Sequence, residues 1–286
     1  MLQIGLLLAL VSALTTNVAL LCKHRGAMAA SNVQLSHPLK SAVALFRSRW
    51  WTIGFAVAIA AWGFHVVALA IAPLSLVETT ISGGLVLLAW LAERWFGVRV
   101  GTREWVGLAL CATGLALLGI TSAGASTSAD YSGDAMIVFE ASAVAAGAAL
   151  LLSGHAKTFG RSSGPLLGAA AGILLGVANV SIKALTGTVP GHVLAILSPW
   201  TLVAVLAGAG AFFALARGFQ TGGAIPVITL TSIAANLASI TGGILVFGDS
   251  IGADPLAIAA RCIAFAAVIA AALVMPASRR LAPAPA

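Results

Sequence analysis

The segment AIPVITLTSIAANLASITGGILVF, residues 224–247, contains no Asp, Glu, Lys or Arg. A helix needs about 20 mainly apolar residues to cross the hydrocarbon of a bilayer, and this segment has that length. It lacks the strict polar and apolar alternation of a membrane β-strand and is about twice as long as such a strand. It therefore predicts a transmembrane helix.

Eight more windows share this character. Only 8% of the residues are charged and 60% are hydrophobic, whereas a soluble protein carries about 25% charged residues. The chain is therefore predicted to be an all-α, polytopic helix bundle of about nine transmembrane helices, surrounded by the lipid bilayer of the cell membrane. The other windows are residues 2–22, 50–72, 74–92, 105–122, 135–154, 165–185, 193–216 and 255–275.

The orientation of the chain follows from its Lys and Arg residues, because cytoplasmic loops carry an excess of them. They fall in every second connection, and five lie within residues 23–49. Residues 23–49 are thus predicted to be a cytoplasmic loop, with the N-terminus outside and residues 277–286 as a cytoplasmic tail. The alternate connections carry no Lys or Arg but hold Asp130, Asp134, Asp249 and Asp254.

Residues 27–46 are the exception to this pattern. They are too polar and too short to span comfortably, and we interpret them as a re-entrant or interfacial helix. If they crossed the membrane, the chain would have ten spans and both ends inside.

The two halves of the chain, residues 1–122 with four spans and residues 123–276 with five, echo each other. Ser48-Arg49-Trp50-Trp51 opens one expected helix, and its counterpart begins with Ser198-Pro199-Trp200. Five spans separate the matched helices, an odd number, so the halves are predicted to be inverted repeats of the kind found in transporters.

Several other classes of function are not supported by the sequence. The net charge of +7 lies in short gaps, not on a face with interleaved aromatic residues, so no nucleic-acid partner is expected. No P-loop, zinc-protease or nucleophile-elbow motif is present, so we expect neither enzymatic activity nor a cofactor. The three cysteines have no paired spacing.

Five segments carry a resemblance to a known family: residues 47–51 (RSRWW), 68–74 (ALAIAPL), 92–94 (AER), 104–107 (EWVG) and 114–119 (GLALLG). In them the chain resembles the drug/metabolite transporter superfamily with EamA-type repeats, and most closely its bacterial NIPA-like branch. The usual Gly-Glu pair is replaced by Ala92-Glu93 and Gly248-Asp249, and the first half lacks one helix.

This resemblance implies a secondary transporter of a small solute. Magnesium or another divalent cation is implied by the NIPA-like branch, whose eukaryotic members are described as magnesium transporters. The wider superfamily also moves organic metabolites and drugs, so an exporter of such a compound is the alternative. A non-transporting membrane subunit is the third interpretation. The substrate, the direction, the coupling ion and the presence of a homodimer stay open.

Ionisable groups inside spans are costly and are therefore functional candidates. With the orientation above, all of them fall in the outer half of the membrane, where they would line a path for a solute or an ion. Glu78 and Glu140 are the candidates for binding a metal cation or carrying a proton. The alternative is that the basic groups only pair with acids between helices. These ionisable residues are His65, Glu78, Glu140, Lys183 and Arg261.

Neutral polar residues mark a second set of candidates for the solute path. Thr229, Ser232, Asn236 and Ser239 recur at spacings of three and four and so share one helix face, with Asn179 on another helix. They are expected either to line the path or to bond across helices.

Four glycines spaced by four residues form one face along the window 165–185, beginning with the residue just before it. Small residues at this spacing let two helix backbones approach closely, so this face is interpreted as a helix-packing ridge. Its members are Gly164, Gly168, Gly172 and Gly176.

Overall fold

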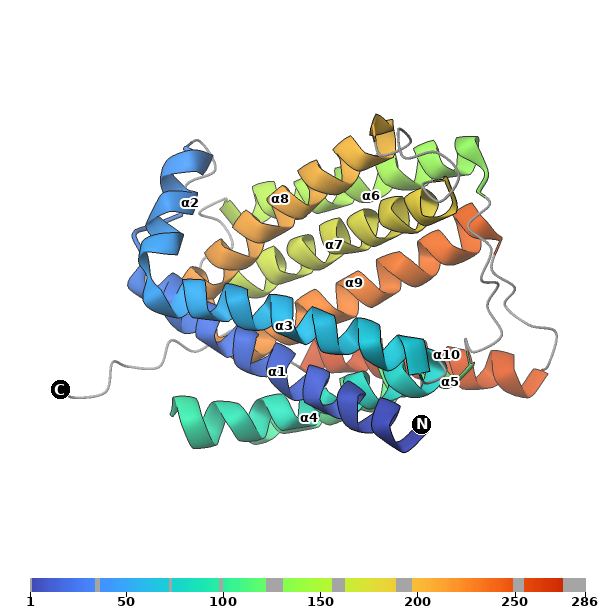
Figure 1. The fold of residues 1–286 in the computed structure, drawn as a ribbon, viewed down its shortest axis with the longest axis horizontal. Helices are drawn as coiled ribbons and strands as arrows, with labels where there is room; N and C mark the ends of the chain where they lie inside the picture. The colour runs from blue at the N-terminus through green and yellow to red at the C-terminus, as the bar shows by residue number, and fades with distance from the viewer. Residues whose placement is uncertain are drawn as a thin grey trace.

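The computed structural model describes residues 2–33, 37–71, 74–97, 100–121, 131–155, 163–188, 197–248 and 255–274, and all regular elements in these ranges are helices (Figure 1). This confirms the all-α prediction. In chain order they are α1 (Leu2–Ala29), α2 (Pro38–Arg47), α3 (Arg49–Ile71), α4 (Leu74–Phe96), α5 (Thr102–Thr121), α6 (Gly133–His155), α7 (Ser163–Thr188), α8 (Pro199–Thr221), α9 (Ala224–Phe247) and α10 (Pro255–Val274).

The long helices overlap the apolar windows one by one. Large apolar side chains such as Trp62, Leu152 and Val138 are exposed on their outer faces, which suits lipid rather than water. These helices are consistent with a membrane protein. Within the described residues, five stretches are long and apolar enough to cross a membrane: Gln3–Ala29, Gly133–Ser153, Ser163–Leu185, Pro199–Thr221 and Ala224–Phe247.

Helix α1 extends beyond its predicted window, which ended at residue 22, and continues to Ala29. Two basic residues in this extension are held over aromatic rings of α3. Lys23 Nζ lies 5.6 Å from the ring centroid of Phe55, and Arg25 Cζ lies 4.3 Å from that of Trp50. These cation–π contacts, together with the long aliphatic parts of the two side chains, allow the helix to continue past the residue at which the apolar window ends.

Helix α2 occupies the second half of the segment 27–46, whose first residues belong to α1. Its ten residues span only about 15 Å, half of the ~30 Å hydrocarbon, so α2 is too short to cross alone. It lies across one end of the bundle instead of along it (Figure 1). Leu45 is fully buried on its inner face, while Leu39 and Val43 are exposed.

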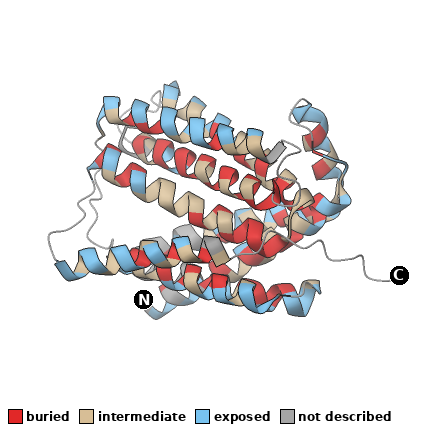
Figure 2. Cartoon of the chain, turned by 180° about the vertical axis from the view of Figure 1, so that it is seen from behind, coloured by how far each residue is buried: buried red, intermediate tan, exposed pale blue. Residues whose placement is uncertain are grey.

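The long helices form two groups. Group A consists of helices that pack together around α1 and α5, namely α1, α3, α4, α5 and α10. Group B consists of the helices that pack around α7, namely α6, α7, α8 and α9. Between the groups, α1 contacts α8, and α9 contacts α5, α10, α1 and α4. Both views show the groups close together near α2 and diverging toward the opposite end (Figures 1 and 2).

The four glycines of α7 lie at its contacts with α8 and α9. A Cβ at Gly168 would come within 2.7 Å of the carbonyl oxygen of Val227, and one at Gly172 within 2.7 Å of Ala234 Cβ. Successive glycines of α7, four residues apart, face residues of α9 that are also four residues apart in the same direction. The two helices therefore run parallel in close backbone contact.

Gly172→Ala is expected to lower the free energy of unfolding by about 1–3 kcal/mol, because the added methyl group overpacks the α7–α9 contact. Thermal unfolding of the detergent-purified protein measures this effect. Gly208→Ala in α8 is the matched control, since nothing lies within 4 Å of its added Cβ. Equal melting temperatures for the two variants would contradict the close contact.

Candidate functional site

The polar face of α9 is divided between two environments. Thr231 Oγ1 donates to the carbonyl of Gly168 on α7 at 2.9 Å, and Ser239 Oγ accepts from Asn179 Nδ2 at 3.3 Å. Thr231, Ser239 and Asn179 are therefore part of the contact between α7 and α9. Successive residues of a helix are rotated by about 100°, so Thr229 and Asn236 fall on the side of α9 opposite Thr231.

Thr229, on this second side, is the candidate with the strongest structural signal. Its side chain is 0% exposed, and its Oγ1 has no hydrogen-bond partner among the described residues. A buried hydroxyl without a partner costs about 1–3 kcal/mol. The described packing therefore leaves a polar atom on this side of α9 without a partner.

Ser232 and Asn236 continue the side of α9 that carries Thr229. Both are half-buried, and Asn236 Nδ2 donates to the carbonyl of Ser232 in its own helix at 2.8 Å. Around α9, burial is nearly complete from Ala224 to Thr231, whereas residues 234–240 are half-exposed on every face. The packing around the polar face thus loosens in the middle of α9, and burial returns at Gly242, Gly243, Val246 and Phe247.

Glu140 lies in α6 and is only 5% exposed. Ser181 Oγ of α7 is 2.5 Å from its Oε1 and 3.0 Å from the carbonyl of Val177. This bond ties α6 to α7 and satisfies one carboxyl oxygen. Glu140 therefore lies inside group B, at the α6–α7 contact.

The two basic candidates have partners that the hydropathy pattern did not indicate. Lys183 Nζ lies 4.2 Å from the ring centroid of Phe247, at the end of α9. Arg261 of α10 donates to the carbonyl of Thr121 at the end of α5. The first contact joins α7 to the end of α9, and the second joins α10 to the end of α5.

Two candidates lie outside what the structure describes at side-chain level. Glu78 is in α4 and His65 in α3, but their side chains are not among those described. Helix α4 belongs to group A and packs on α1 and α5, whereas Glu140 is on α6 in group B. The convergence of Glu78 and Glu140 on a cation stays a prediction. In the described part, no three His, Cys, Asp or Glu residues gather to hold a metal.

Sequence reasoning missed Gln220, near the end of α8. Gln220 Nε2 donates to the carbonyls of Ala27 and Ser31, each at 3.0 Å, and its Oε1 accepts from the backbone N–H of Val33 at 2.9 Å. One amide thus holds the chain that follows α1 against α8. The only available signal was an amide three residues after Arg217 at the end of an apolar run.

Aromatic rings reinforce this junction between groups A and B. His24 of α1 meets the buried Phe219 edge-on, with centroids 5.4 Å apart, and Trp51 of α3 meets Phe212 at 5.3 Å. The Gln220 clamp and these rings lie at the α2 end of the molecule. The groups are therefore bonded to each other at the end where α9 is fully enclosed.

Comparisons of the chain with family models, with curated proteins and with solved structures gave no match.

Gln220→Ala is expected to release the chain after α1, because it removes an acceptor for Val33 N–H and a donor for two carbonyls. Hydrogen–deuterium exchange should show faster exchange in residues 30–33. Thr221→Val is the control, since the Thr221 hydroxyl bonds only within α8, to the carbonyls of Arg217 and Gly218. Unchanged exchange in Gln220→Ala would show that the clamp does not order this segment.

Proposed function

We propose that the chain is a multi-pass secondary transporter of nine transmembrane helices that binds a small solute between two inverted halves. The observation that carries this proposal is Thr229, a fully buried hydroxyl without a described partner on the side of α9 that faces group A. Transporter sites of this kind lie at the interface of the repeats, near the middle of the membrane.

Matching hydrogen bonds support the inverted halves. Asn17 Nδ2 of α1 donates to the carbonyl of Gly84 on α4 at 2.6 Å. Asn179 of α7 makes the corresponding contact with Ser239 of α9. In each half the two helices run parallel, but α1 runs toward the α2 end of the molecule and α7 runs away from it (Figure 1).

The uneven junction between the groups supports alternating access. The Gln220 clamp and the aromatic rings close the α2 end, and the groups diverge at the other end. With the basic end inside, as Lys23, Arg25 and Arg49 favour, this arrangement is closed to the cytoplasm. Transport then requires that the clamp opens while the opposite ends of the groups approach.

The described polar groups favour a neutral or zwitterionic solute. Hydroxyl and amide groups of Thr229, Ser232 and Asn236 offer both donors and acceptors, whereas Mg²⁺ prefers carboxylate oxygens and retains its waters. The magnesium alternative depends on Glu78 and on the resemblance to the NIPA-like branch. The two alternatives therefore make different demands on Thr229 and Glu78.

Thr229→Val is expected to weaken solute binding about five- to tenfold without loss of stability, because it removes one hydrogen-bonding group and nearly keeps the volume. A thermal-shift screen of the purified protein with neutral sugars, amino acids and MgCl2 identifies the solute. Counterflow of that solute in proteoliposomes then compares wild type with Thr229→Val. Thr121→Val is the control, since the Thr121 hydroxyl bonds only its own helix.

Magnesium entry into the same proteoliposomes, read with an internal dye, tests the other alternative. Entry that Glu78→Gln abolishes and Thr229→Val leaves intact would favour the cation transporter. A protein that carries neither organic solutes nor magnesium would support the non-transporting membrane subunit.

A further inference from the structure

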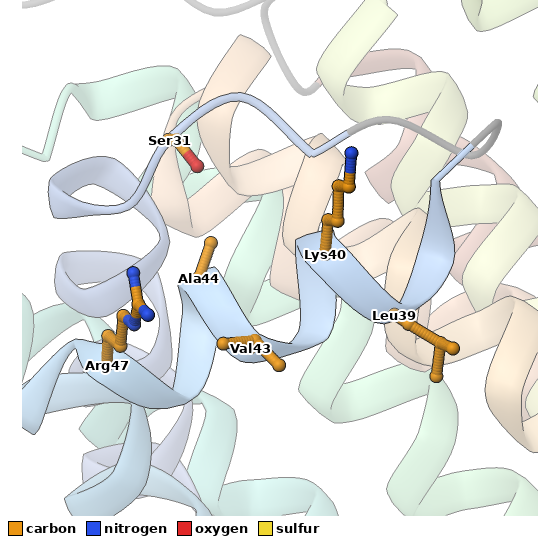
Figure 3. A pocket seen from close by; sticks show the side chains of 6 residues that line it. All are labelled: Ser31, Leu39, Lys40, Val43, Ala44 and Arg47. Atoms are coloured by element: carbon orange, nitrogen blue, oxygen red, sulfur yellow. The ribbon is translucent and has the colours of Figure 1, made fainter.

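Helix α2 borders a pocket on the side that faces the chain following α1 (Figure 3). Lys40 and Arg47, two turns apart, extend from the same side of α2 toward Ser31, while Leu39 points away from them (Figure 3). The pocket has a volume of about 420 Å³ and is lined by Ser31, Leu39, Lys40, Val43, Ala44 and Arg47.

The charges around this pocket are of one sign. No Asp or Glu precedes Glu78 in the chain, so α1, α2 and α3 bring only basic groups to this end. Glu93 and Glu104, which do not line the pocket, are bonded at the α4–α5 connection: Glu93 accepts from Val100 N–H at 3.2 Å, and Glu104 from Gly101 N–H at 2.8 Å. An ammonium, a guanidinium and a hydroxyl together suit a phosphate group.

The apolar residues of α2 indicate what the phosphate is attached to. Leu39 is 81% exposed and Val43 53% exposed, at the edge of the same pocket. A free phosphate ion gains nothing from such side chains, whereas acyl chains of a lipid bury them. Helices with a basic side and an exposed apolar side lie in the interface of a membrane in this way.

The position of α2 is fixed from its C-terminal end. Phe46 contacts the rings of Phe55 and Phe212, with centroids 5.4 and 6.1 Å apart, and Thr52 Oγ1 donates to its carbonyl at 2.9 Å. Leu45 is fully buried beside it. The pocket is therefore presented on a held helix, at the end of the molecule where the basic residues gather.

We propose that this pocket binds an anionic phospholipid, with its phosphate between Lys40 and Arg47 and its acyl chains along Leu39 and Val43. The occupant is a structural lipid of the bilayer and is independent of any transported solute. Binding would hold α2 flat on the membrane surface.

Native mass spectrometry of the detergent-purified protein, titrated with phosphatidylglycerol or phosphatidylcholine, tests the proposal. We expect preferential binding of phosphatidylglycerol, reduced about fivefold for each charge removed and about 25-fold in the double variant Lys40→Gln/Arg47→Gln. Arg103→Gln is the matched control, because it removes an exposed cation at the start of α5, at the same end of the bundle. The control should keep the affinity of the wild type.

Four results would overturn the proposal. One is equal affinity of wild type and the double variant for phosphatidylglycerol. Another is an equal loss in Arg103→Gln, which would indicate general attraction by positive charge. The third is displacement of the lipid by millimolar inorganic phosphate or glycerol 3-phosphate, which would assign the pocket to a soluble anion. Leu39→Ser/Val43→Ser should weaken binding of the lipid, and an unchanged lipid affinity there would also contradict it.

Discussion

Close backbone contact is the constraint on which this bundle depends, because helices in lipid gain little from burying apolar side chains against each other instead of against acyl chains. The contact between α7 and α9 meets this constraint with glycines, and that between α1 and α3 does so at Gly26, whose position leaves no room for a Cβ beside Trp51. Where backbones come this close, short side chains such as Ser12 reach the carbonyl of a neighbouring helix, here Ala61 at 2.9 Å.

The same packing explains which polar side chains find a hydrogen-bond partner on a neighbouring helix and which do not. Hydroxyls and amides at close contacts are satisfied by the facing helix, as Thr231 and Asn179 are. Thr229 lies on the other side of α9, where group A does not approach it with an acceptor or a donor among the described residues. Four other buried side-chain atoms in the described residues also lack a partner, on Trp51, Ser198, Thr201 and Arg261, but Thr229 is the one that lies on α9.

The positions of the helices could be predicted from the sequence far better than the contacts that their side chains make. Long uncharged runs have one stable form in lipid, since every backbone group must be bonded within the segment, and each window accordingly overlaps a helix. The apolar window ended at residue 22, whereas α1 continues to Ala29 with Lys23 and Arg25 over rings of α3. The periodicity of α9 grouped Ser239 with Thr229, yet a small difference in angle turns Ser239 to α7. The Gln220 clamp joins residues nearly two hundred positions apart, and local patterns do not contain such a pairing.

The glycine contact also limits how α7 and α9 can shift against each other. Gly168, Gly172 and Gly176 meet α9 residues that recur with the same spacing of four, among them Val227, Thr231 and Ala235. A translation of about 6 Å, four residues of helix rise, would bring each glycine to the position of the next. Smaller shifts would place side chains against the backbone. The two helices can therefore pack closely only in discrete registers, and the glycine spacing sets the distance between one register and the next.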